Sequence, residues 1–146
     1  MVKYLFKAMR PRQWTKNAFI FAALIFDRKL LDFSALKQTL LAFLLFCLLA
    51  SSVYLINDIM DREADRAHPA KKNRPIASGK LPVSIALGAG IILLVISLTG
   101  GFFLSRGFFL ISLVYFAINM LYSKWLKHVV IIDVLVIASC FVLRVA

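Results

Sequence analysis

Long apolar runs alternate with short charged segments along the chain. Five runs are candidate membrane-spanning helices: residues 14–31, 35–56, 81–104, 108–121 and 129–143. A spanning helix needs about 20 mostly apolar residues, which the second and third runs supply in full. The first run carries charges at both ends and is expected to tilt or to lie partly in the interface. The pattern predicts an all-α fold, a polytopic transmembrane helical bundle with about five spans.

The composition supports a membrane location. Hydrophobic residues make up 62% of the 146 residues, whereas a typical soluble domain is roughly half apolar. The net charge of +11 is of a size that can indicate nucleic-acid binding. However, the cations flank the apolar runs, where they face lipid headgroups or a phosphorylated ligand. We therefore expect a membrane as the partner, and we do not expect a nucleic acid. Cys47 and Cys140 lie inside apolar runs, without metal-ligand or redox spacing.

The distribution of Lys and Arg predicts the orientation. Residues 1–16, 57–80 and 122–128 hold 13 of the 18 Lys and Arg residues, and five alternating spans place these three segments on the same side. By the positive-inside rule this side faces the cytoplasm, as expected for a bacterial-type inner membrane protein. The last run meets Arg144 just before the sequence stops, so residues 1–146 are expected to be the N-terminal part of one transmembrane domain of a longer protein.

The most charged stretch, NDIMDREADRAHPAKKNRPIASG, covers residues 57–79 between two apolar runs. The preceding span is predicted to continue as a helix to about Ala67, because His68 precedes Pro69 and is biased away from helical geometry. At helical spacing, four oxygen-bearing side chains share one face. These side chains are Asn57, Asp58, Asp61 and Asp65.

This acidic face is costly unless a cation neutralises it. Carboxylates at this spacing repel one another, and near the end of a helix they oppose its macrodipole. Ligand sets made only of oxygen suit Mg²⁺ or Mn²⁺. Five neighbouring cations could bind phosphate oxygens: Arg66, Lys71, Lys72, Arg74 and Lys80. The stretch thus predicts a metal–diphosphate site. The alternative is a solvated loop in which Asp58 pairs with Arg62 and Glu63 pairs with Arg66.

The stretch also resembles the first aspartate-rich motif of the UbiA superfamily of intramembrane prenyltransferases, N-x-x-x-D-x-x-x-D, here Asn57, Asp61 and Asp65. Two further blocks, RPRQWTKN at 10–17 and LYSKWLKHVVIIDV at 121–134, make the chain similar to the decaprenyl-phosphate phosphoribosyltransferase branch. The similarity covers essentially the whole chain. It implies a helical bundle of about nine spans, with a second aspartate-rich motif in a part that this sequence does not contain.

In the branch that the chain resembles, the donor is phosphoribosyl pyrophosphate and the acceptor is a polyprenyl phosphate. The resemblance implies Mg²⁺ or Mn²⁺ bound by Asn57, Asp61 and Asp65. It also places Asp58, Asp61 and Asp65 in the catalytic centre. The expected substrate-binding residues are Lys16, Asn57, Arg66, Lys71, Arg74, Tyr122 and Lys127.

Several of these assignments have an alternative. Lys16 is equally well explained as an interfacial lysine whose amine reaches the headgroups. Asp133, a carboxylate inside an apolar run, is either a cavity-lining residue or a structural partner of Lys16 or Lys127. His68 fits a loop residue better than a catalyst.

Two other functions compete with phosphoribosyl transfer. Within the superfamily, the same motif serves transfer of a prenyl group from an allylic diphosphate to an aromatic or tetrapyrrole acceptor, because both reactions expel diphosphate. Outside it, a small transporter or channel subunit could use Asp133 and Arg144 as pathway charges, but this leaves the acidic cluster without a role.

Overall fold

A computed structural model describes residues 1–19, 21, 25, 28 and 31–123 of the chain. Three long helices form its frame: α3 (Phe33–Met60), α5 (Val83–Leu104) and α6 (Arg106–Leu121). Shorter elements are α1 (Val2–Ala8), the 3₁₀ helix η1 (Pro11–Phe19), α4 (Arg62–Ala67) and the 3₁₀ turn η2 (Lys71–Asn73). The described residues contain no strand, which agrees with the predicted all-α class.

Helices α3 and α5 pack closely because small residues lie where they meet. The Ser52 hydroxyl of α3 donates to the Gly90 carbonyl at 2.8 Å. A Cβ atom at Gly100 would lie 2.7 Å from Cδ2 of Leu45. Small side chains allow this close approach of two backbones, as is common between helices in membranes.

Helix α6 completes the frame by packing against both other helices. Phe46 and Tyr115 join α3 to α6 with ring centroids 4.7 Å apart. Ser105 begins α6, since its hydroxyl accepts from the Phe108 amide. Most apolar side chains of α5 remain exposed, as expected for a helix that faces lipid.

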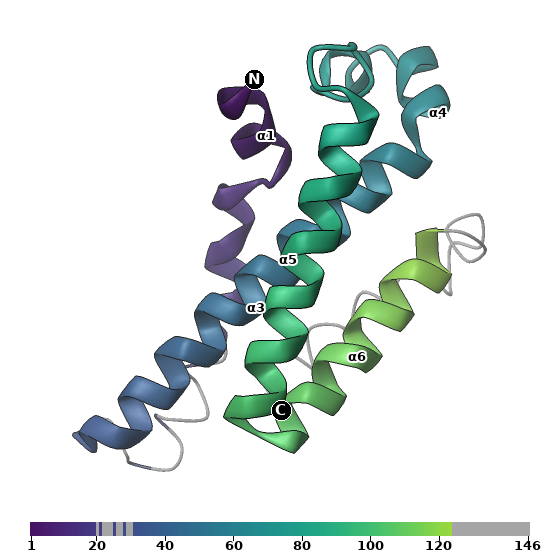
Figure 1. Cartoon of the computed structure of the whole chain (residues 1–146). Helices are drawn as coiled ribbons and strands as arrows, with labels where there is room; N and C mark the ends of the chain where they lie inside the picture. Colours follow the sequence, from purple (N-terminus) through teal and green to yellow (C-terminus); the bar gives the residue numbers. More distant parts are fainter. Residues whose placement is uncertain (20, 22–24, 26–27, 29–30, 124–146) are drawn as a thin grey trace.

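A second apolar cluster lies at the end of the bundle that carries the charged stretch. It consists of Ala8, Leu55, Ile76, Leu81 and Ala86. These residues come from α1, α3, the loop before α5, and α5 itself, so the N-terminal segment and that loop are fixed to the same end of the frame. Figure 1 shows α1, α4 and the loop between α4 and α5 gathered there.

The structure agrees with some of the predicted spans and differs from others. Helices α3 and α5 are long and apolar enough to cross a membrane, which agrees with the long apolar helices predicted for residues 35–56 and 81–104. The run 108–121 is helical, and α6 has 16 residues. Residues 11–19 form a 3₁₀ helix, so the described start of the first predicted span is not α-helical. The run 129–143 lies outside the described residues.

Candidate functional site

The helix that carries the acidic residues is broken at Asp61. Helix α3 ends at Met60, Asp61 has φ −91° and ψ 6°, and α4 begins at Arg62. The predicted continuous helix to Ala67 is therefore interrupted once. Its predicted end is confirmed, because His68 before Pro69 is extended at φ −90° and ψ 130°.

Arg74 joins two of the predicted carboxylates. Its Nη1 donates to Oδ1 of Asp58 at 3.2 Å and to Oδ2 of Asp65 at 2.9 Å. Both carboxylates are only 3% exposed, so each needs a charged partner in this setting. An arginine has five N–H donors, and Nε and Nη2 of Arg74 donate to no acceptor among the described residues. These remaining donors are suited to binding a phosphate in a bidentate way.

Arg10 supplies the second partner of Asp58 from the other end of the chain. Its Nη2 donates to Oδ1 of Asp58 at 2.7 Å, and its guanidinium lies 4.8 Å from the ring centroid of Tyr54. Arg10 has φ +54°, in the left-handed region that a residue with a Cβ rarely adopts. Such a conformation costs about 1–3 kcal/mol. The contacts with Asp58 and Tyr54 offset this cost.

Hydrogen bonds on both sides of Arg10 hold the N-terminal segment against α3. The Ser51 hydroxyl, fully buried, donates to the Met9 carbonyl at 3.0 Å. The same hydroxyl accepts from the indole N–H of Trp14 at 2.9 Å. One serine therefore anchors the residues before and after Arg10, which places the guanidinium beside Asp58.

These contacts border a cavity of about 260 Å³ at the junction of α1, α3 and the loop after α4. Its lining includes Lys7, Arg10 and Arg74 as cations, Asp58 as the one acid, and Asn73. The lining thus has an excess of positive charge in a recess at the end of the bundle. Such a surface attracts anions, and phosphate groups fit the guanidinium geometry.

The loop after α4 is fixed by its own polar contacts. Nδ1 of His68 accepts from the amides of Ala70 and Lys71 at 3.1 and 3.3 Å, which is a structural role in the loop. Nε of Arg66 donates to the Ala77 carbonyl at 2.9 Å. Arg66, predicted to bind substrate, thus joins α4 to the loop.

The donors expected to bind a metal are hard oxygens. Oδ1 of Asn57 accepts a short hydrogen bond from the Ser123 hydroxyl. Asp61 is half-buried at the helix break, and Arg74 contacts a single oxygen of Asp65. Among the described residues, no three His, Cys, Asp or Glu side chains form a metal-ligand group. A set of two carboxylates and one amide oxygen nevertheless fits Mg²⁺, which typically uses one or two carboxylates and takes its other ligands from water and substrate phosphates.

The remaining predicted residues lie at different places. Lys16 is exposed on η1 and Lys71 is exposed on η2. Tyr122 is half-buried immediately after α6. Lys127 lies outside the described residues, as do Asp133 and Arg144.

Two contacts of Asp58 differ from what spacing suggests. The alternative pairing of Asp58 with Arg62 is wrong, because Asp58 pairs with Arg10 and Arg74 instead. The pairing of Glu63 with Arg66 is present at 3.5 Å.

Sequence reasoning missed Lys7 and Arg10 as residues of this site. Arg10 belongs to the RPRQWTKN block, but no local periodicity connects it to a carboxylate 48 residues away.

The frame of long apolar helices, with a charged cluster at one end, is typical of helical membrane proteins. The UbiA prenyltransferase family model matches residues 18–146. The chain therefore belongs to the UbiA prenyltransferase family, as the sequence motifs indicated.

Curated relatives share similarity over nearly the whole chain. A decaprenyl-phosphate phosphoribosyltransferase of Mycolicibacterium smegmatis is 40% identical over 99% of this chain and 46% of its own length. The Mycobacterium tuberculosis protein of the same name is 38% identical over 99% of this chain and 49% of its own. A digeranylgeranylglyceryl phosphate synthase of Sulfurisphaera tokodaii is 30% identical over 69% of this chain and 36% of its own. The chain spans about half the length of the first two relatives.

Proposed function

We propose that the protein containing this chain transfers 5-phosphoribose from phosphoribosyl pyrophosphate to a polyprenyl phosphate and releases pyrophosphate. The observation that carries this proposal is the 38–40% identity, over 99% of the chain, to proteins named decaprenyl-phosphate phosphoribosyltransferase. The cationic recess at one end of apolar helices supports it, because both substrates carry phosphate groups and the acceptor lies in a membrane.

In the proposed reaction, an oxygen of the lipid phosphate attacks the anomeric carbon of the ribose. The bond from that carbon to the pyrophosphate oxygen breaks, and its electron pair leaves with pyrophosphate. Positive charge develops on the ribose ring while negative charge grows on the leaving group. Preorganised donors and cations near the leaving group therefore lower the barrier.

The described residues have distinct parts in this proposal. Arg74, held by Asp58 and Asp65, presents its remaining N–H groups to a phosphate. Because this side chain is already ordered, binding costs it little conformational entropy. Asn57, Asp61 and Asp65 would hold a Mg²⁺ or Mn²⁺ ion, which would supply positive charge to stabilise the diphosphate leaving group.

Other cations in the proposal complete the binding of the two phosphorylated substrates. Lys71 is exposed and follows Ala70, which lines the recess, and it is proposed to contact a donor phosphate. Lys16, Arg66, Tyr122 and Lys127 remain proposed substrate contacts, with Arg66 also holding the loop. The site loops are proposed to face the cytoplasm of a bacterial-type inner membrane.

A transfer assay with the full-length protein tests the proposal. Labelled phosphoribosyl pyrophosphate and polyprenyl phosphate are supplied in detergent, with Mg²⁺ or with a chelator. We expect label to enter the lipid phase only with the metal, and Asp61→Asn to lower the rate about a hundredfold or more. Glu63→Gln is the matched control, because that carboxylate is 81% exposed, its contact with Arg66 is long at 3.5 Å, and it makes no ion pair with Arg10 or Arg74 among the described residues. Its rate should stay near that of the unmodified protein.

The second candidate function is prenyl transfer from an allylic diphosphate, which the similarity to the Sulfurisphaera tokodaii synthase favours. The same assay distinguishes the two by donor. Label incorporated from an allylic diphosphate, with none from phosphoribosyl pyrophosphate, would replace the first proposal by the second.

A further inference from the structure

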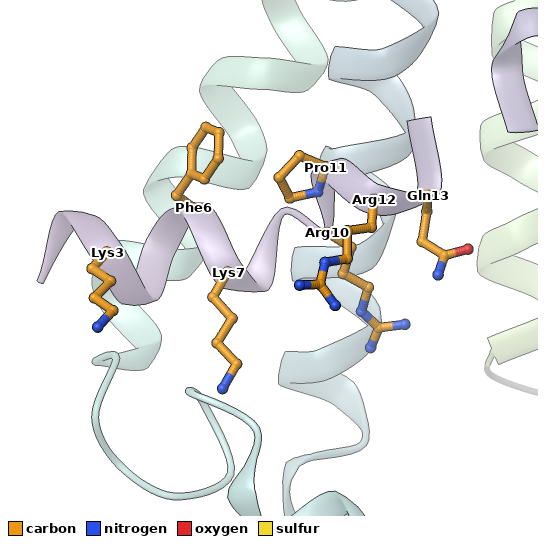
Figure 2. A pocket seen from close by; sticks show the side chains of 7 residues that line it. All are labelled: Lys3, Phe6, Lys7, Arg10, Pro11, Arg12 and Gln13. Atoms are coloured by element: carbon orange, nitrogen blue, oxygen red, sulfur yellow. The ribbon is translucent and has the colours of Figure 1, made fainter. Parts of the chain in front are cut away.

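A second cavity lies beside the recess, on the N-terminal segment. Its volume is about 530 Å³, and it is lined by Lys3, Phe6, Lys7, Arg10, Pro11, Arg12 and Gln13. Figure 2 shows Lys3 and Lys7, one helical turn apart, extending in the same direction from α1, while Phe6 extends in another direction in this view. The lining thus combines four cations with apolar side chains.

Three of these cations have no acidic partner in the described part of the chain. Arg10 is paired with Asp58, whereas Lys3, Lys7 and Arg12 make no ion pair there. All three are exposed. Close cations repel one another unless an anion lies between them, so this arrangement is suited to a ligand with more than one negative charge.

The charge and the apolar side chains together define the ligand class. A phosphate monoester carries a charge of about −1.5 to −2 at neutral pH and three acceptor oxygens. A phosphodiester headgroup carries only a single negative charge. Phe6 is 55% exposed and, with Pro11, offers apolar contact that a soluble sugar phosphate does not use. A phosphate monoester on an apolar chain satisfies both features.

The position of the cavity connects it to the proposed reaction. Lys7 and Arg10 line both this cavity and the recess that contains Asp58 and Arg74. The cavity that contains Lys3 and the recess that contains Asp58 therefore share two lining side chains.

We infer that the cavity on α1 and the start of η1 binds the phosphate end of the lipid acceptor, a polyprenyl monophosphate. Lys3, Lys7 and Arg12 contact the phosphate, and Phe6 and Pro11 contact the first isoprene units. Arg10 lines both cavities, and the acceptor phosphate meets the donor beside this side chain. This inference rests on the proposed function and adds the place where the acceptor enters.

Binding to the full-length protein in nanodiscs of neutral phosphatidylcholine tests the inference. Farnesyl monophosphate is titrated in, and the dissociation constant is measured by calorimetry. The double variant Lys3→Gln, Lys7→Gln should raise that constant roughly a hundredfold, about tenfold for each charge-assisted hydrogen bond that it removes. Lys7→Arg should retain most of the affinity, because it keeps the charge. Lys37→Gln is the matched control, since Lys37 is an exposed lysine in the first turns of α3, and it should change the constant less than about twofold.

Competition experiments identify the source of the phosphate. Inorganic phosphate and phosphoribosyl pyrophosphate should displace farnesyl monophosphate only weakly, and phosphatidylserine in the nanodisc should have little effect. Unchanged binding by the double variant overturns the inference. So does equal competition by phosphatidylserine, which would indicate a general membrane contact, or strong competition by phosphoribosyl pyrophosphate through Lys3 and Lys7, which would indicate the donor.

The inference and the proposed function fail separately. Binding that depends on Lys3 and Lys7, without any transfer from phosphoribosyl pyrophosphate, contradicts the proposed function alone. Transfer in which the double variant keeps the KM for the lipid contradicts the inference alone.

Discussion

The acidic stretch after α3 and the N-terminal segment meet at the same end of the bundle, but their charges are arranged differently. The acidic stretch supplies most of its own ion-pair partners. Asp58 and Asp65 are buried and both pair with Arg74, which lies in the same stretch. The N-terminal segment contributes only Arg10 to this network and leaves Lys3, Lys7 and Arg12 exposed. The charges of the acidic stretch are mostly paired with one another, whereas most cations of the N-terminal segment are exposed.

The difference shows why charge density alone is a poor guide to a binding site. Buried charges that are paired fix geometry, because breaking a pair inside a low-dielectric region is costly. Exposed cations without partners are available to a ligand and cost little to remove. The acidic stretch therefore sets positions, and the N-terminal segment provides free charge beside it.

The largest effect is expected from Arg74→Gln. This change leaves two buried carboxylates without their shared partner, and breaking a buried pair costs about 3–5 kcal/mol. The midpoint of thermal unfolding in detergent, followed by tryptophan fluorescence, should fall clearly, and the proposed phosphoribosyl transfer should be abolished.

Lys72→Gln is the control for this variant, because Lys72 is an exposed cation two residues away. It should leave the unfolding midpoint unchanged. An Arg74→Gln protein that unfolds like the unmodified protein would show that the Asp58–Arg74–Asp65 contacts contribute nothing to the fold.

Much of this arrangement could be predicted from the sequence, for identifiable physical reasons. The two long spans follow from hydropathy, and the helix end at Ala67 follows from the proline after His68. Clustering of Asp58 and Asp65 follows from helical periodicity, and both contact Arg74. The pairing of Asp58 with Arg10 could not be predicted, because it depends on the N-terminal segment folding back onto α3, a tertiary contact without a local pattern.

The 3₁₀ helix is a second feature that hydropathy did not predict. The run from residue 14 is apolar enough to suggest a span, yet Pro11–Phe19 forms a 3₁₀ helix. Its residues are held from outside by tertiary hydrogen bonds, such as that from Trp14 to Ser51. A 3₁₀ run of nine residues is unusually long, and tertiary contacts of this kind override local propensity.

A smaller effect than that of Arg74 is expected from Arg10→Gln. Asp58 keeps its contact with Arg74 in this variant, so the change removes one charged hydrogen bond, about 1.5–3 kcal/mol. Relief of the left-handed backbone conformation is not expected, because the glutamine still carries a Cβ.

A double-mutant cycle measures this link between the two regions. The unfolding free energies of Arg10→Gln, Asp58→Asn and the double variant should reveal a coupling of about 0.5–3 kcal/mol. Arg12→Gln is the control, since Arg12 is exposed and unpaired among the described residues. Strict additivity of the Arg10 and Asp58 changes would contradict a direct interaction and leave the two regions energetically independent.

The smallest effect is expected from Ser51→Ala, which removes the hydroxyl that contacts both Met9 and Trp14. Stability should fall by about 1–2 kcal/mol, because the partly buried Met9 carbonyl and Trp14 indole lose their partner. The N-terminal segment should then open more often, so trypsin should cleave faster after Arg12 and Lys16. Ser52→Ala is the matched control: it removes one buried hydrogen bond of similar length, to Gly90 between α3 and α5. Its stability should fall comparably while cleavage near the N-terminus stays slow. Equal cleavage in the two variants would mean that Ser51 acts through general stability, and that the free cations are positioned by α1 packing alone.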